Sequence, residues 1–392
     1  MSRRSSTLLL VLAYAAFVSL GLPDTVLGVA WPSLRREFAL SQGAMGAVLA
    51  TGVCGYFLSG LLAGVLIRKV GVGGLLALSS AAVALALAGY ALAPSWRTFY
   101  PIGFLMGLGS GAIDSGLNGY AARHFSVRHV NWLHACWGIG ASTGPLIMTA
   151  AIATGHGFRG GYGALAVVLG SMAAAFLITS RAWKAAPAVA SAGAASGDAR
   201  EEGSFGTALR SARVWLHLFT FFVYTGLEAS VGQWCFSLMR EQRGLGVEAA
   251  GSWTSSYWAS LTLGRILLGF VIDRFGPDRL LRAATFGVVI GAALFALDSG
   301  AAGRAGLLLL GLSLSPMYPT LMARTPARVG AHITHHAVGF QVSAATLGSS
   351  LLPSLLGLWV ARMGYGAIGF LAVALSLALF VAHEGLLRLK PA

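Results

Sequence analysis

The sequence predicts an all-α membrane protein in which twelve transmembrane helices form two pseudo-symmetric bundles of six, and three observations predict this class. Hydrophobic residues make up 56% of the 392-residue chain and charged residues only 10%, whereas a soluble domain has roughly a quarter charged residues. The apolar residues fall into segments of about 20, long enough to cross roughly 30 Å of hydrocarbon as helices. Segments of the first half of the chain also recur, in order, in the second half.

Each predicted span is a largely apolar stretch bounded by charged, glycine-rich or proline-containing segments. The first stretch has no small-residue cleavage site typical of a signal peptide, so we expect it to stay as the first helix. The twelve spans are residues 8–31, 44–67, 73–93, 98–122, 132–154, 161–180, 214–239, 250–272, 279–299, 304–323, 336–361 and 364–382.

The charges of the chain are unevenly distributed between its loops. The formal net charge is +14, with 27 Lys and Arg. If the N-terminus is inside, 18 of these basic residues fall in cytoplasmic segments, eight in outer segments, and Arg265 alone within a span. The positive-inside rule therefore predicts a multi-pass inner (plasma) membrane protein with both termini in the cytoplasm. We attribute the basic charge to topology and expect no nucleic-acid partner.

An internal repeat divides the chain. "GLLAGVLIRKVG" (60–71) aligns with "RILLGFVIDRFG" (265–276), "DTVLG" (24–28) with "EASVG" (228–232), and "HACWG" (134–138) with "HHAVG" (335–339). Matches in the same order indicate two duplicated six-helix halves. Between them lies a stretch rich in Ala, Gly and charge, which is typical of a flexible linker. The predicted domains are a first bundle, 1–180, a cytoplasmic linker, 181–213, and a second bundle, 214–392.

Two parallel halves joined by such a linker resemble the major facilitator superfamily. "GFVIDRFGPDR" (269–279) is similar to its G-x-x-x-D-R-x-G signature, although "GVLIRKVG" (64–71) has Arg68 where the first copy should have a carboxylate. Four further motifs resemble the fucose and hexose:proton symporter branch and its sodium–glucose relatives: "GLGSGAIDSGLNGY", "FFVYTGLEASVGQW", "GLSLSPMYPTLM" and "GFQVSAATLGSSLLPSLLG". The resemblance implies a major facilitator fold and sugar import coupled to protons or sodium, with carboxylates on the first and fourth helices.

Three acids inside spans are costly unless they are protonated, paired or wetted, and are therefore candidate proton-coupling and substrate-binding groups. Asp24 and Glu228 occupy the same position in the two repeats, and Asp114 lies one turn before Asn118 on the same side of its helix. An acid and an amide together suit the recognition of hydroxyl groups. Packing or helix-terminal roles are the alternative for each acid. Further candidates for the substrate site are His134, Trp137, Gln233, Trp234 and Gln341.

Basic and acidic residues near the cytoplasmic ends of the second half are candidate gating groups: Arg265, Asp273 and Arg274. Counted along the helices, Arg265 lies about 11 Å and Asp114 about 12 Å from the cytoplasmic ends. This similarity favours Asp114 over Glu228 as the partner of Arg265, with both partners left open. Snorkelling of Arg265 to the cytoplasm is the alternative.

The leading interpretation is a secondary active transporter that imports a neutral monosaccharide or similar polyol by proton symport through alternating access. Alternatives are a proton-driven exporter of small amphipathic compounds and a non-transporting membrane receptor or scaffold. We expect no enzyme, since no nucleophile–base set occurs in a loop, and no cofactor or metal. The expected partners are the substrate, a proton or sodium ion and the lipid bilayer, with the protein a monomer. The sequence leaves open the substrate, the direction of transport, the coupling ion and the oligomeric state.

Overall fold

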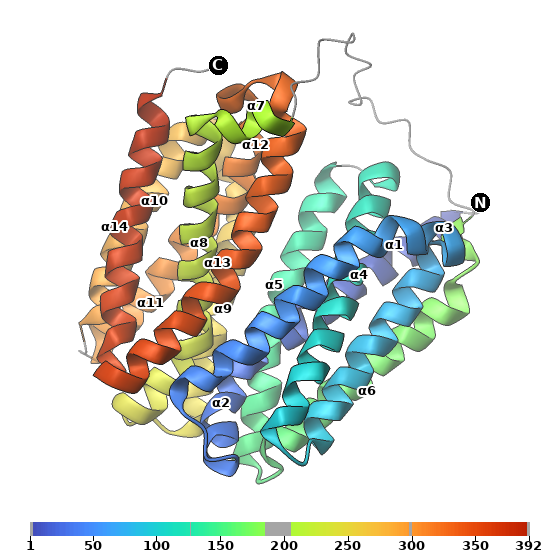
Figure 1. Ribbon diagram of the computed structural model, residues 1–392, viewed down its shortest axis with the longest axis vertical. Helices are drawn as coiled ribbons and strands as arrows, with labels where there is room; N and C mark the ends of the chain where they lie inside the picture. Colours follow the sequence, from blue (N-terminus) through green and yellow to red (C-terminus); the bar gives the residue numbers. More distant parts are fainter. Residues whose placement is uncertain (1–2, 126, 185–204, 298–299, 390–392) are drawn as a thin grey trace. The chain divides into compact units, whose positions relative to one another are not determined.

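The computed structural model describes residues 3–125, 127–184, 205–297 and 300–389, and these ranges contain helices and no strands (Figure 1). The predicted all-α class is confirmed. The helices of the first half are α1 (Arg3–Asp24), α2 (Val26–Glu37), α3 (Met45–Leu92), α4 (Phe99–His124), α5 (Val127–Ala153) and α6 (Gly157–Thr179). Those of the second half are α7 (Phe205–Arg210), α8 (Ala212–Ser237), α9 (Val247–Phe275), α10 (Pro277–Ala296), α11 (Gly300–Leu314), α12 (Met317–Val329), α13 (Thr334–Met363) and α14 (Gly366–Arg388).

Contacts divide the chain into two units. Unit 1 comprises Met1–Ala194 with Gly244–Ser255, and unit 2 comprises Ala195–Arg243 with Ser256–Ala392. In unit 1, α1 packs on α5, and α3 packs on α4 and α6; in unit 2, α8 packs on α13, and α10 packs on α11 and α14. The domain boundaries predicted at residues 180 and 214 stay predictions, because residues 185–204 of the predicted linker lie outside the described ranges.

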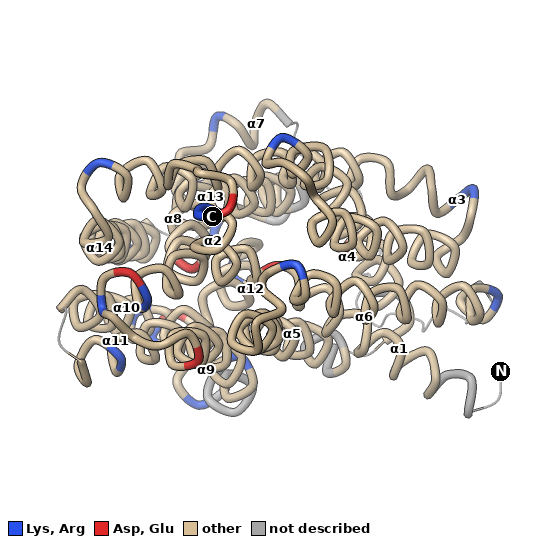
Figure 2. Tube along the Cα trace, turned by 90° about the horizontal axis from the view of Figure 1, so that it is seen from below, with Lys and Arg blue, Asp and Glu red and all other residues tan. Residues whose placement is uncertain are grey.

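The helices match the twelve predicted spans. Among the described residues, nine segments are long and apolar enough to cross a membrane. One of them, Gln42–Leu92, contains two predicted spans, and α4 and α9 account for the remaining two. Each of these two helices carries a charged candidate residue within its span, Asp114 on α4 and Arg265 on α9. Along the backbone trace, positions of Lys, Arg, Asp and Glu are few and are separated by long uncharged stretches (Figure 2).

The repeat is also visible in the backbone. Gly71 interrupts α3 with φ 72° and ψ 171°, and Gly276, its counterpart in the sequence repeat, separates α9 from α10 with φ 75° and ψ 153°. This left-handed conformation costs an L side chain energy that glycine avoids. Both halves therefore turn from their second to their third helix at equivalent glycines, which agrees with the predicted repeat.

Two spans predicted as continuous are interrupted. The first is divided between α1 and α2 at Thr25, directly after Pro23 and Asp24, and the tenth between α11 and α12 at Ser315 and Pro316. Proline removes a backbone donor and its ring disturbs the preceding turn, which is the usual cause of a break in a helix. The first break places the carboxylate of Asp24 at a helix end.

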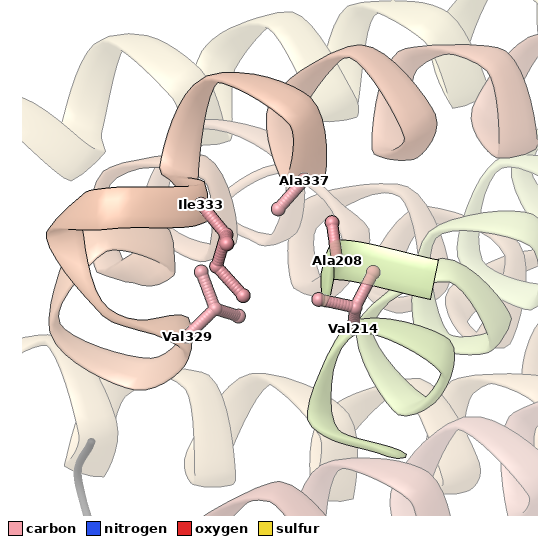
Figure 3. Close-up of a cluster of buried hydrophobic side chains, with 5 residues drawn as sticks. All are labelled: Ala208, Val214, Val329, Ile333 and Ala337. Atoms are coloured by element: carbon pink, nitrogen blue, oxygen red, sulfur yellow. The ribbon is translucent and has the colours of Figure 1, made fainter. Parts of the chain in front are cut away.

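A small cluster of buried apolar side chains joins several elements of unit 2 (Figure 3). Its members come from five elements: Ala208 on α7, Val214 on α8, Val329 on α12, Ile333 at the end of the short 3-10 helix Ala331–Ile333, and Ala337 in the first turn of α13. All five are at most 3% exposed. The short helix α7, which follows the predicted linker, is thus packed into unit 2 by burial of apolar surface.

Candidate functional site

Asp24 is the last residue of α1 and is exposed, although Pro23 and Thr25 beside it are buried. The Trp137 Nε1–H of α5 donates a hydrogen bond to Asp24 Oδ2 at 2.9 Å. The Thr25 hydroxyl donates to the carbonyl of Ala141, also on α5, at 2.8 Å. The break in the first span is therefore tied to α5, and it presents an accessible carboxylate next to an indole.

Glycines allow α1 and α5 to approach closely enough for these bonds. A Cβ added at Gly21 would collide with the Trp137 carbonyl, and one at Gly140 would collide with the Val18 carbonyl. Small residues on spanning helices permit such backbone contact. The position of Asp24 relative to Trp137 therefore depends on these glycines.

We expect Gly21→Ala to lower stability and transport together, because the new methyl group must push α1 away from α5. Forced overpacking typically costs about 1–3 kcal/mol. The measurement is the melting temperature of the purified protein and uptake by vesicles that contain it. Gly170→Ala on α6 is the matched control, because a Cβ there meets nothing within 4 Å. Equal behaviour of the two variants would contradict the close-packing argument.

Asp114 on α4 is held by two neutral donors. The Tyr56 hydroxyl donates to Oδ2 at 2.7 Å, and Asn118 Nδ2 donates to Oδ1 at 2.8 Å. The predicted pairing of acid and amide is thus present, and each carboxylate oxygen accepts one bond. Asp114 also lies close enough to Asp24 for its charge to act on that carboxylate. Unit 1 therefore brings two acids, an amide and an indole into one polar region.

Tyr56 was missing from the sequence-based candidates, and the repeat gave no signal for it, because the alignment of 60–71 with 265–276 places Leu261 at the equivalent position. Tyr56 and Tyr257 are each followed three residues later by a serine whose hydroxyl donates to the tyrosine carbonyl. Tyr257 in turn donates to the backbone carbonyl of Glu228 at 3.0 Å. The two tyrosines lie about one turn out of register in the repeat and bind different groups, the carboxylate of Asp114 and the backbone of Glu228.

The remaining candidate on α5, His134, is exposed and lies one turn before Trp137. Its ring meets the ring of Phe17 edge-on, with 5.4 Å between the centroids. Trp137 itself is half-buried, so part of its indole surface stays accessible. Both side chains are thus at least partly accessible, and their assignment to the substrate site stays a prediction.

In unit 2, Glu228 forms an ion pair with Arg265, whose Nη2 lies 3.7 Å from Glu228 Oε1. The Tyr224 hydroxyl, one turn earlier on α8, donates to Glu228 Oε2. The side chains of the pair are only 12% and 17% exposed. The preference for Asp114 as the partner of Arg265 is therefore corrected to Glu228. Counting depth along separate helices ignored the reach of the arginine side chain and the packing of α9 beside α8.

Three predicted site residues of unit 2 are buried. Trp234 is 0% exposed and donates from Nε1 to the Pro353 carbonyl on α13 at 3.0 Å. Gln341 is 0% exposed and accepts from the Thr325 hydroxyl at 3.1 Å, and Gln233 is 7% exposed. In this conformation Trp234 and Gln341 act as packing residues, and no indole face of Trp234 is open to a sugar ring. Their assignment to the substrate site stays a prediction.

The predicted gating residues have different environments. Arg274 is exposed and lies over the ring of Phe275, 5.9 Å from its centroid. Asp273 belongs to α9, but its side chain lies outside the described part of the chain. The described carboxylate of this loop is Asp278, in the first turn of α10. The sequence offered a signal for it, since Pro277 at the first helical position followed by an acid is typical of a helix start.

Asp278 joins α10 to α12 through two arginines. Arg324 donates to both carboxylate oxygens, at 3.1 and 2.7 Å, and Arg328 donates to Oδ1 at 2.8 Å. The Arg328 side chain is only 10% exposed, while that of Asp278 is 40% exposed. Bidentate pairing of this kind fixes the relative orientation of the two helices.

We expect Asp278→Asn to destabilise the protein by about 2 kcal/mol, because it leaves the buried guanidinium of Arg328 without its carboxylate. A drop of roughly 5 °C in the melting temperature would follow. Glu384→Gln is the control, since its bonds to Arg282 at 2.6 and 2.7 Å involve an arginine that is 59% exposed. Exposed ion pairs contribute about 0–1 kcal/mol. An equal drop in melting temperature for Asp278→Asn and Glu384→Gln would contradict the greater contribution of Asp278 to stability.

The described residues contain no group of three or more His, Cys, Asp or Glu that could hold a metal ion. Comparison with known proteins identifies the family, because a model of the Major Facilitator Superfamily matches residues 13–353. The chain belongs to the Major Facilitator Superfamily. It is therefore a multi-pass membrane transporter rather than an enzyme, and the predicted fold is confirmed.

Relatives and solved structures of this superfamily resemble the whole chain. The glucose/mannose transporter GlcP of Bacillus subtilis (strain 168) is 20% identical over 347 residues, which cover 88% of this chain and 86% of GlcP. The crystal structure of the E. coli fucose:proton symporter FucP has a TM-score of 0.64 at 16% identity and covers 97% of this chain and 99% of its own. A D-xylose-proton symporter has a TM-score of 0.79 at 14% identity and covers 98% of both chains.

Proposed function

We propose that this transporter imports a neutral monosaccharide or similar polyol by proton symport through alternating access. The observation that carries the proposal is the polar region of unit 1, where Asp114 is held by Tyr56 and Asn118 and lies within electrostatic reach of Asp24. Carboxylates and amides bind hydroxyl groups in pairs. The names of the relatives support the substrate class, since GlcP transports glucose and mannose and the two structures are proton symporters of fucose and xylose.

We propose separate roles for the acidic residues of the two units. Asp24 and Asp114 accept hydrogen bonds from neutral donors, Trp137, Tyr56 and Asn118, and are proposed as the groups that take up and release the proton. Glu228 is paired with Arg265, so it ranks behind them as a proton carrier. Trp137 and His134 complete the proposed sugar site beside Asp24, with the indole face against the C–H surface of the ring.

Transport by purified protein in liposomes tests the proposal. A panel of labelled hexoses, deoxyhexoses and pentoses is offered with and without an imposed pH gradient, acidic outside. We expect at least one sugar to accumulate only with the gradient. If no sugar of the panel accumulates under any gradient, the proposed function is wrong. If uptake depends on sodium at fixed pH, the coupling ion is sodium instead of the proton. Expulsion of amphipathic dyes driven by the same gradient would favour the exporter alternative.

We also propose that the protein resides in the inner membrane with both termini in the cytoplasm, on the basis of the 18 to 8 distribution of basic residues. A reporter that is active only in the cytoplasm, fused after Ala392, should be active, and one that is active only outside should be inactive. The reverse pattern would invert the topology and exchange the two mouths of the transporter.

A further inference from the structure

An apolar groove runs along the outer face of unit 2 between α8 and α14. Its volume is about 570 Å³, and the residues that line it are all apolar. Leu216 and Phe219 form the α8 side, and the exposed Leu377 and Val381 form the rim on α14. Small residues lie between them, namely Ala378, Ala382 and Gly385. The groove exists because these α14 positions, spaced at four and three residues, carry little or no side chain on one helix face.

One end of the groove lies at the depth of a membrane interface. Trp215, next to Leu216, is 54% exposed and donates from its indole to the Leu209 carbonyl on α7 at 2.7 Å. Exposed tryptophans of membrane proteins gather at the level of the lipid headgroups. A Cβ on Gly385 would lie 3.4 Å from Leu216, so the start of α8 and the end of α14 are adjacent there.

Two basic residues lie just beyond the interfacial end of the groove. Arg213, in the first turn of α8, precedes Leu216 by three residues, and Arg388, the last residue of α14, follows Gly385 by three. Residues three apart on a helix share a face, so both arginines lie on the groove side, one turn further out. The neighbouring acid, Glu384, directs both of its oxygens to Arg282. Positive charge therefore predominates at the headgroup end of an apolar groove.

We propose that this groove binds an anionic phospholipid, with one acyl chain between α8 and α14 and the phosphate at Arg213 and Arg388. The apolar lining matches the acyl chain, and the two guanidinium groups match a headgroup phosphate whose negative charge is not offset by a cation of the same headgroup. Ordinary contact with bulk lipid does not require an apolar groove and a pair of arginines at the same place. The lipid occupies a lipid-facing surface of unit 2 and is independent of the sugar site proposed for unit 1.

Titration of the purified protein with dioleoyl phosphatidylglycerol or phosphatidylcholine in detergent micelles tests the proposal, with bound lipid counted by native mass spectrometry. We expect phosphatidylglycerol to be retained preferentially. The double variant Arg213→Gln/Arg388→Gln should bind it about tenfold more weakly or worse, since each arginine near the headgroup contributes to binding. Gly385→Leu, which fills the groove, should reduce retention of both lipids.

Arg304→Gln/Arg362→Gln is the matched control, because it removes the same charge at the opposite ends of unit 2 helices, the start of α11 and the end of α13. It should keep the preference for phosphatidylglycerol. Equal retention of the two lipids by the parent would overturn the proposal, as would an equal loss in the control, which would indicate a general effect of net charge. If Gly385→Leu does not fold, the proposal is tested by comparing lipid retention in the Arg213/Arg388 and Arg304/Arg362 double variants alone.

Discussion

Asp24→Asn and Asp114→Asn are each expected to abolish sugar accumulation driven by a pH gradient while leaving sugar exchange intact. Net symport requires a group that binds a proton on one side and releases it on the other, whereas exchange of labelled for unlabelled sugar requires no net protonation cycle. An asparagine keeps a side-chain oxygen that can accept from Trp137 at position 24, or from Tyr56 at position 114. The substitution therefore removes the titration and preserves much of the geometry.

The expected size of the effect follows from the driving force. One pH unit corresponds to about 1.4 kcal/mol, so a symporter that moves one proton per sugar can accumulate sugar about tenfold per unit of gradient. The variants should instead equilibrate the sugar. Accumulation and counterflow are measured in the same liposome preparation, so that a poorly folded variant is recognised by loss of both.

Glu37→Gln provides the control for removal of an acid from unit 1. Glu37 forms an ion pair with Arg159 at 2.6 Å, and 42% of its side chain is exposed. The Glu37→Gln variant should therefore accumulate sugar like the parent protein. Parental accumulation in both Asn variants would show that neither acid carries the proton, and Glu228 would be tested next. Loss of exchange together with accumulation in a well-folded variant would instead assign that acid to sugar binding.

Arg265→Leu is expected to be the most destabilising of these substitutions, because it leaves Glu228 buried beside Tyr224 without its cation. Loss of one partner of a buried ion pair typically costs about 3–5 kcal/mol. A fall of about 10 °C in the melting temperature of the purified protein should result. Glu228 cannot turn to water, since its side chain is only 12% exposed.

The double variant Arg265→Leu/Glu228→Leu should recover most of this loss, because two apolar side chains of similar size can replace a buried ion pair at little cost. Additive losses of the two single variants would show that the groups are not coupled. Arg282→Leu, in an exposed pair with Glu384, should cost at most about 1 kcal/mol and serves as the control. The recovered double variant can then be tested for transport, which separates stability from any gating role of Arg265.

The sequence alone determined the class, the spans and the duplication. Apolarity over about 20 residues is a local property, so the twelve spans could be identified without any knowledge of packing. The repeat identified Gly71 and Gly276 as equivalent, and both have the left-handed backbone that makes glycine necessary. The helical period also placed Asn118 over Asp114, because four residues make about one turn. These features require only neighbours along the chain.

Only the tertiary structure decided which side chains meet across helices. Asp24 and Trp137 are 113 residues apart, and Tyr56 and Asp114 are 58 apart, so their bonds depend on how each helix is rotated and how closely glycines let the helices approach. The same rotation buried Trp234 against α13 and turned Arg265 toward Glu228. Depth along a helix can be counted from the sequence. The direction in which a side chain points around the helix axis, relative to its neighbours, is determined by packing.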